Sequence, residues 1–103
     1  MIIIKTSSDN FDTLEKICKQ VISKKLAACA NIIPGCYSYF YWEGKIQKNQ
    51  EYLVFIKTFK ISEKKIYEII NKYHNYDIPE ILTLKVENIE KNYMKWASGE
   101  INR

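Results

Sequence analysis

Arginine, histidine, glycine and proline are scarce in this sequence. Of its 103 residues, three are Gly, two are Pro, one is His and one is Arg. So little Gly and Pro excludes fibrous proteins and flexible linkers. The sequence has no Gly-rich phosphate loop and no Gly-x-Ser-x-Gly motif, and no run approaches the roughly 20 apolar residues of a membrane span. We therefore expect a soluble, cytoplasmic chain that neither inserts into a membrane nor catalyses a reaction.

The positive net charge is weak evidence for an anionic partner. Lys and Arg exceed Asp and Glu by 16 to 12, but the only arginine is Arg103. Ile, Lys, Asn and Tyr all have A/T-rich codons, so the base composition of a genome can raise the lysine content without selection for binding. Proteins that bind nucleic acid or phosphate rely on the forked guanidinium of Arg. No nucleic-acid partner is expected.

The three cysteines show no metal-binding or disulfide pattern. Cys18, Cys29 and Cys36 are odd in number and contain no Cys-x-x-Cys spacing. A structural zinc site or a disulfide framework favours paired cysteines. We expect reduced thiols.

The hydrophobic pattern predicts one domain over residues 1–103, because a single core usually serves about 100–150 residues. Apolar residues recur every three or four positions in two segments, which predicts two amphipathic helices. Ser62 is the expected N-cap of the second helix, with Ile61 packing against Ile66. Pro34–Gly35 is expected to interrupt an apolar segment, and Gln47–Gln50 to form a polar rim. The predicted elements are a strand at Ile2–Ile4, a helix from Phe11 to about Lys25, an apolar segment at Ala27–Ile33, strands at Tyr37–Trp42 and Tyr52–Phe59, a helix from Ile61–Ser62 to Tyr73, a strand at Ile81–Val86 and a short helix at Tyr93–Trp96.

This order predicts an α+β fold, the ferredoxin-like βαββαβ sandwich, with an antiparallel sheet, two helices on one face and an extra C-terminal helix. We expect the strands at Tyr37–Trp42 and Tyr52–Phe59 to pair as a β-hairpin rich in aromatic residues, many of which would lie on the second face of the sheet. We expect another subunit to cover that face, although the aromatics could instead complete the chain's own core. RNA-recognition domains share this order, but their third strand carries a Gly-containing aromatic motif that Glu51–Phe59 lacks.

Five motifs occur in order along nearly the whole chain: KLAACANIIPG at 25–35, YWEGKI at 41–46, IKT at 56–58, HNYDIPE at 74–80 and YMKW at 93–96. They resemble the CutA family, the divalent-cation tolerance proteins. The resemblance implies a homotrimer built like the PII signalling proteins and joined through the long hairpin strands. It also implies a role in divalent-metal tolerance, with copper(II) binding in some members, and no catalysed reaction.

The copper ligands of the family match Lys5, Tyr73 and His74 in this sequence. Only His74 keeps ligand chemistry, because a protonated lysine repels a cation and a phenol is a poor substitute for imidazole. The proline that usually follows the histidine is Asn75 here. Two hypotheses for His74 stay open: a metal ligand or polar wall of a cleft, or a cap that donates toward the last carbonyls of the second helix.

The resemblance also implies a pocket between subunits, lined by Cys29, Trp42, Lys57, Tyr76 and Glu80. An acid, a base, a thiol and two aromatics suit a small anionic or zwitterionic ligand, but no His or Asp is placed to activate Cys29. The alternative is a Lys57–Glu80 ion pair that stabilises the fold or the trimer.

The sequence thus predicts a homotrimeric, non-catalytic CutA-like protein that binds copper(II) or another divalent cation and contributes to metal tolerance. The alternative is a PII-like sensor that binds a small ligand and signals to a protein partner of unknown identity.

Overall fold

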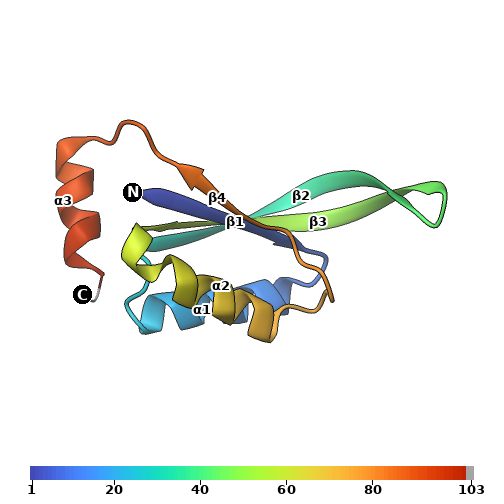
Figure 1. Ribbon diagram of the computed structural model, residues 1–103, viewed down its shortest axis with the longest axis horizontal. Coiled ribbons are helices and arrows are strands. Elements are labelled where there is room, and N and C mark those ends of the chain that lie inside the picture. Colours follow the sequence, from blue (N-terminus) through green and yellow to red (C-terminus); the bar gives the residue numbers. More distant parts are fainter. Residues whose placement is uncertain (102–103) are drawn as a thin grey trace.

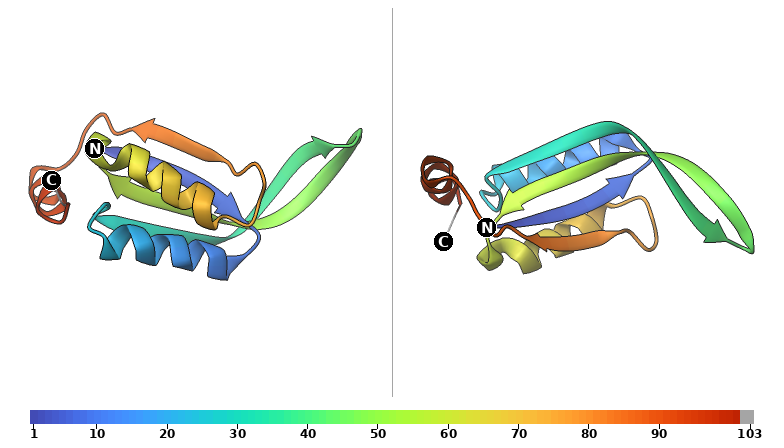
Figure 2. Two further views of the ribbon diagram at one scale, coloured as in Figure 1. Left: turned by 60° about the horizontal axis from the view of Figure 1, so that its bottom comes forward. Right: turned by 90° about the horizontal axis from the view of Figure 1, so that it is seen from above.

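The computed structural model describes residues 1–101. Within this range the chain folds as a two-layer α+β sandwich, with α1 and α2 packed on one face of a four-stranded antiparallel sheet (Figures 1 and 2). The strand order is β2-β3-β1-β4, which confirms the predicted ferredoxin-like fold. The elements are β1 (Ile2–Ser8), α1 (Phe11–Ser23), β2 (Cys29–Trp42), β3 (Lys45–Thr58), a 3-10 turn (Lys60–Ser62), α2 (Glu63–Tyr73), β4 (Ile81–Lys85) and α3 (Lys91–Gly99).

The two sandwich helices follow the predicted apolar spacing. The carboxamide of Asn10 caps α1 by accepting a hydrogen bond from the backbone N–H of Thr13, 3.1 Å away. Ser62 precedes α2 as expected, but its side chain makes no capping hydrogen bond, because a 3-10 turn leads the chain into the helix. Ile61 is exposed to solvent.

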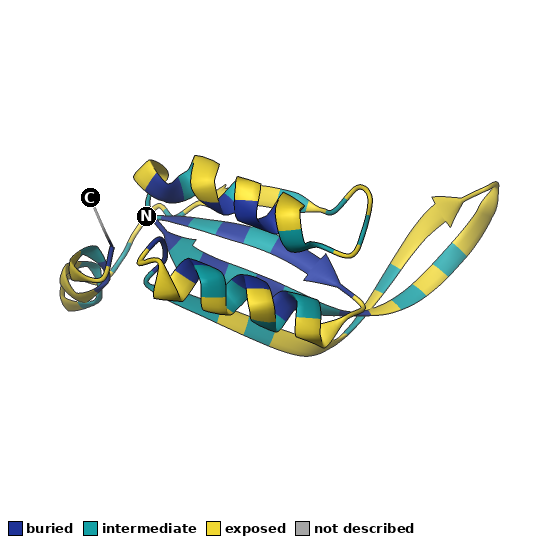
Figure 3. Ribbon diagram, turned by 90° about the horizontal axis from the view of Figure 1, so that it is seen from below, coloured by how far each residue is buried: buried dark blue, intermediate teal, exposed yellow. Residues whose placement is uncertain are grey.

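The core lies between the helices and the inner face of the sheet (Figure 3). Alternate residues of β1 and β3 point inward, and the helices meet them with one apolar stripe each. The buried core residues are Ile2, Ile4, Leu14, Ile17, Val21, Leu26, Ala27, Val54, Ile56, Ile66, Ile69 and Ile70. None of these residues comes from 36–51, so the core forms without that segment.

Residues 36–51 form a two-stranded ribbon that projects beyond the sandwich, and we call it the arm (Figure 1). Its tip is a two-residue turn, Glu43–Gly44, in which both φ angles are positive, at 52° and 76°. This is the geometry of a type I′ turn, whose twist matches that of the strands. The arm corrects two expectations. Pro34–Gly35 forms a bulge inside β2 rather than a break, and Gln47–Gln50 lies in β3 rather than in a rim.

The sequence suggested that many aromatic residues of the hairpin lie on the outer face of the sheet, but most of them lie on the arm, and only Phe55 is on that face. By strand alternation Tyr37, Tyr39 and Tyr41 share one side of the arm, and all three are exposed. The outer face of the sheet itself, which we call the open face, carries Ile3, Lys5, Cys29, Asn31, Ile33, Leu53, Phe55, Lys57, Leu82 and Leu84 by register with the buried residues.

The arm makes the molecule long. Its extents are 47 × 26 × 21 Å and its radius of gyration is 14.5 Å, against about 13 Å for a compact domain of 100 residues. The accessible surface is 7034 Å², whereas a monomer of this mass usually exposes about 6,100 Å². The chain thus exposes nearly 1,000 Å² more than its size requires.

Candidate functional site

Lys5 lies at the centre of β1 on the open face, and its ammonium group is 2.9 Å from a carboxylate oxygen of Glu80. The two residues come from β1 and from the segment before β4, which pair as antiparallel neighbours. This ion pair replaces the Lys57–Glu80 pair that we considered from sequence. The ammonium group of Lys5 is directed at an acid, which accounts for a lysine where the family resemblance places a metal ligand.

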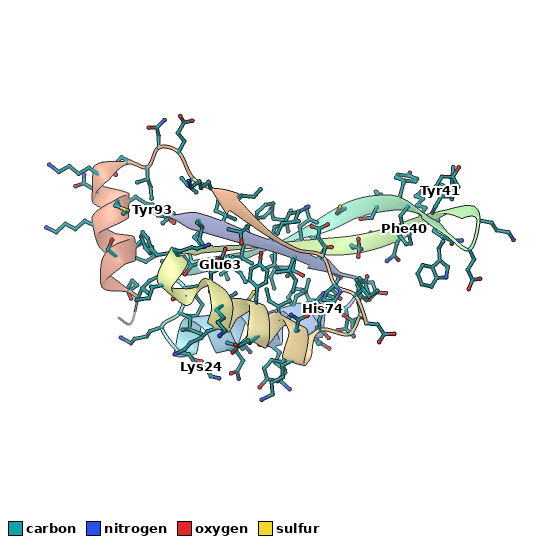
Figure 4. The ribbon with its side chains drawn as sticks, viewed as in Figure 1. Lys24, Phe40, Tyr41, Glu63, His74 and Tyr93 are labelled. Atoms are coloured by element: carbon teal, nitrogen blue, oxygen red, sulfur yellow. The ribbon has the colours of Figure 1, made fainter. Side chains whose placement is uncertain are left out.

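Lys57 and Cys29 are direct cross-strand partners on β3 and β2. The ammonium group of Lys57 lies 5.8 Å from the ring centroid of Tyr93, within range of a cation–π contact. Tyr93 belongs to α3, which stands at the end of the sheet opposite the arm (Figure 4). Lys57, Cys29 and Tyr93 thus form a small polar group at one end of the open face, which also carries Lys5 and Asn31.

Tyr76 lies in the segment between α2 and β4 and joins this segment to the arm. Its hydroxyl donates to Oε2 of Glu51 at 2.7 Å, and it accepts from the backbone N–H of Asp9 at 2.9 Å and the amide of Asn49 at 3.2 Å. Burial disfavours the phenolate, and donation to Glu51 favours the neutral phenol, so the pKa of Tyr76 rises to about 12.

The five residues of the predicted pocket do not converge within one copy of the chain. Cys29 and Lys57 are neighbours, Glu80 pairs with Lys5, and Tyr76 bonds to the root of the arm. Trp42 is the last residue of β2, at the tip of the arm that carries the labelled Phe40 and Tyr41 in Figure 4. Any pocket that contains all five residues must be completed by a second copy.

His74 is the C-cap of α2, and both of its ring nitrogens have partners. Its backbone N–H donates to the carbonyl of Ile70. Nδ1 accepts from the backbone N–H of Tyr76 at 3.0 Å, so Nε2 carries the proton and donates to the carbonyl of Ser7 at 2.8 Å. The imidazole therefore connects α2 to the end of β1, and it is directed at a strand carbonyl rather than at the helix carbonyls that we expected.

The positions that match the family's copper ligands do not fit a copper ion. Lys5 is paired with Glu80, the ring of Tyr73 lies beneath the ammonium groups of Lys16 and Lys72 at 4.7 and 5.2 Å, and His74 has no free nitrogen. Within residues 1–101, no three His, Cys, Asp or Glu side chains are grouped so that they could hold a metal ion.

Glu51 is the functional candidate that the sequence analysis missed. Only 6% of this residue is exposed, and among residues 1–101 it is the one acidic residue that is buried. Its oxygens accept from Ser38 Oγ at 2.5 Å and from Tyr76 at 2.7 Å. Its place directly before the apolar run of β3 was the available signal, because an acid there must find partners or cost free energy.

A separate hollow of about 1040 Å³ lies where the sheet ends near Ile101, and Met1, Phe59 and Lys85 are among its lining residues. It contains none of the five predicted pocket residues. Across the described part of the chain, no helix has both the length and the apolar character that crossing a bilayer requires.

Comparisons with known proteins agree with the fold. A family model described as "CutA1 divalent ion tolerance protein" matches residues 1–100. The chain is 35% identical to "Protein CutA, chloroplastic" of Arabidopsis thaliana over 98 residues, which are 95% of this chain and 54% of that protein. It therefore spans only about half the length of that plant relative.

Two further relatives match over nearly their full lengths. The chain is 32% identical to the "Divalent-cation tolerance protein CutA" of Escherichia coli over 101 residues, which are 98% of this chain and 89% of the relative. It superposes with a TM-score of 0.92 on the structure of the "Periplasmic divalent cation tolerance protein CutA from Archaeoglobus fulgidus", at 30% identity and with 99% and 100% of the two chains covered. The family match, the sequence identity and the shared fold together establish that the chain belongs to the CutA divalent-cation tolerance family.

Proposed function

We propose that this protein contributes to divalent-cation tolerance as a non-catalytic homotrimer in the cytoplasm, with the arms as the joining elements. The arm is the observation that supports this proposal. It adds nothing to the core of its own chain, yet it carries a concentrated set of exposed large apolar residues: Tyr37, Tyr39, Phe40, Tyr41, Trp42 and Ile46. Tyr37, Tyr39, Tyr41 and Ile46 share one side of the arm, and an exposed apolar surface of this kind is typical of a protein interface.

Sedimentation velocity and native mass spectrometry at micromolar concentration test the assembly. We expect a mass of three chains of 12.2 kDa each. Ile46→Lys, on the arm, should weaken association because it introduces a charge into the interface. The matched control is Ile78→Lys, on the segment before β4, where the side chain is also exposed. A monomeric wild-type protein would refute the proposed assembly.

Metal binding needs a separate test, because the tolerance function does not by itself require a copper site in each chain. Copper(II) is the first ion to titrate, by calorimetry against the tag-free protein. Both nitrogens of His74 are engaged, and residues 1–101 hold no group of three His, Cys, Asp or Glu side chains, so a tight site would need ligands from more than one copy. We expect His74→Ala to leave copper affinity unchanged. Stoichiometric binding that this substitution abolishes would show instead that the ring releases its partners to bind metal.

A second function, binding of a small ligand between copies, is favoured by the group formed by Cys29, Lys57 and Tyr93. Lys57 has a cation–π contact but no carboxylate partner within the described residues, so an anionic ligand could approach it. A panel of amino acids and dicarboxylates, screened by thermal shift, tests this function. Binding that Lys57→Ala removes and His74→Ala preserves would support the small-ligand function, as in a PII-like sensor. No stabilisation by any member would oppose it.

A further inference from the structure

The arm leaves the body of the molecule at a point where its backbone is free to bend. Beyond the bulge it has only two strands, without a third strand or a helix packed along it (Figures 1 and 2). Gly35, within the bulge, has a φ angle of 83° and nothing within 4 Å of where a side chain would begin. The local backbone therefore does not fix the direction of the arm, and the side chains at its root must do so.

Three side chains meet at that root, and we call Ser38, Glu51 and Tyr76 the clasp. Ser38 lies on β2 within the arm, Glu51 lies opposite Cys36 where the ladder resumes after the bulge, and Tyr76 belongs to the body. One carboxylate oxygen accepts from Ser38 and the other accepts from Tyr76, so Glu51 connects the two strands of the arm to the body.

Because Glu51 is buried, its carboxylate needs hydrogen-bond donors. A buried carboxylate without partners is costly, and no cation forms an ion pair with Glu51 in the described part of the chain. The hydroxyl groups of Ser38 and Tyr76 instead donate the hydrogen bonds that solvent or a cation would otherwise provide to the carboxylate. Swinging the arm away from the body would break the hydrogen bond from Tyr76 to the Glu51 carboxylate, and the loss of this bond to a charged group opposes that motion.

Tyr76 is itself held from several sides. Its oxygen accepts from the backbone N–H of Asp9 in the body, and it also accepts from Asn49 of the arm, which adds a second bond between arm and body. The neighbouring Asn75 accepts from Ser8 and donates to Asp9, at 2.5 and 2.9 Å, which joins this segment to the turn between β1 and α1. Tyr76 is thus a fixed point against which the arm is oriented.

The length of the arm magnifies any motion at its root. Glu51 is six positions along β3 from Lys45 at the tip, which at about 3.4 Å per position gives a lever of about 20 Å. Each rotation of about 10° at the root would move the tip by about 3.5 Å, close to the distance of a carbon–carbon contact. The tyrosine side of the arm would then lose its match to any partner surface.

We propose that the clasp sets the direction of the arm, and that Glu51 and Tyr76 are positioning residues for self-association. This role rests on the proposed assembly for its function, but the rigidity of the arm is measurable in a chain of any oligomeric state. The interface residues provide the contact area, and the clasp determines where that area points.

Hydrogen exchange of the full chain, measured by mass spectrometry, tests the clasp. Tyr76→Phe removes the donor and Glu51→Ala removes the acceptor. In both variants we expect exchange of residues 36–51 to accelerate at least fivefold, the factor that corresponds to one ordinary hydrogen bond. The core strand β1 should keep its wild-type exchange, which separates a freed arm from general destabilisation. In sedimentation, both variants should dissociate at higher concentration than the wild-type protein.

Two matched variants control for size and hydroxyl loss. Glu51→Gln should remain close to wild type, because its carbonyl can accept from Tyr76 while Ser38 accepts from its amide. Tyr73→Phe removes a nearby phenol hydroxyl that has no hydrogen bond in the described residues. Unchanged arm exchange in Tyr76→Phe and Glu51→Ala, or an equal acceleration in β1, would overturn the clasp. If the wild-type protein is a monomer, the proposed assembly fails, and the exchange data still decide whether the clasp exists.

Discussion

Deleting the arm should leave the body folded and remove its ability to assemble. The change replaces Cys36–Glu51 with an Asn-Gly turn, which joins Gly35 to Tyr52 across neighbouring strands. No core residue is lost. The side-chain bonds that are lost between arm and body are those of Tyr76 to Glu51 and to Asn49. At ordinary values they are together worth about 2–4 kcal/mol, against about 5–15 kcal/mol for a domain of this size.

The wild-type protein and the chain without the arm should differ most in how dilution changes their melting temperatures. For a trimer that unfolds to three chains, a hundredfold dilution removes two-thirds of RT ln 100, or about 1.8 kcal/mol per chain. For about 100 residues that corresponds to a melting temperature lower by about 7–14 °C. The shortened chain should unfold cooperatively at a temperature that does not depend on its concentration.

Circular dichroism melts at 1 and 100 μM, with sedimentation velocity at both concentrations, measure these effects. A shortened chain without cooperative unfolding would show that the arm is needed for the fold of the body. A wild-type melting temperature that does not change on dilution would show that the arm does not mediate assembly. Either result would refute the division between core and arm.

Three further predictions concern single residues. Burial raises the pKa of Cys18 from 9.0 to about 11, so at pH 8 its alkylation by iodoacetamide should be about 100-fold slower in the folded chain than in urea. Because the raised pKa belongs to the folded state, the stability that it contributes is complete below pH 9 and is lost as the pH rises toward 11. Equal alkylation rates in the folded and unfolded chain would contradict this prediction. Gly44→Ala should lower the free energy of unfolding in urea by about 1–2 kcal/mol, because φ is 76° at this position. Gly99→Ala, at the end of α3 with an ordinary φ and open space around it, should be neutral or stabilising by up to about 1 kcal/mol. Equal effects of the two substitutions would show that a side chain does not strain the turn. Leu14→Ala, at a fully buried position, should cost about 3–5 kcal/mol in the same assay, and a loss below about 1 kcal/mol would show that the α1 interface is not packed as described.

The sandwich could be predicted because its helices and its inner strands carry local patterns. Leu14, Ile17 and Val21 recur at helical spacing, and all three are buried. The order of helices and strands then allowed few sheet topologies, because short connections and neighbouring strands favour the ferredoxin-like strand order that the structure has. The type of each element followed from the periodicity of its apolar residues. The predicted bounds, however, differ from the observed ones by several residues: β1 was predicted at Ile2–Ile4 and extends to Ser8.

The arm could not be predicted from the same patterns. A ribbon that is exposed on both sides has no apolar alternation, so the sequence predicted a polar rim at Gln47–Gln50, although this segment pairs with Tyr37–Phe40. Pro34 looked like a strand breaker, yet at a bulge its missing N–H need not serve the ladder.

The site was predicted less well than the fold, because contacts between distant strands depend on register. Whether Glu80 would meet Lys5 or Lys57 is decided by how β1 lies between β3 and β4, and no short-range pattern encodes that order. The two bonds of the His74 ring were equally hidden, because their partners are backbone groups that every residue possesses.

The sheet order has a consequence for how the chain folds in time. The strands of the arm meet through a two-residue turn, so they can pair within microseconds of emerging, as β-hairpins do. β1 must wait for β3, because Ile2 pairs with Thr58 and Ser8 with Tyr52, and closing such long loops is slower. We therefore expect the aromatic hairpin to form before the core, so that encounters between chains compete with folding during that interval.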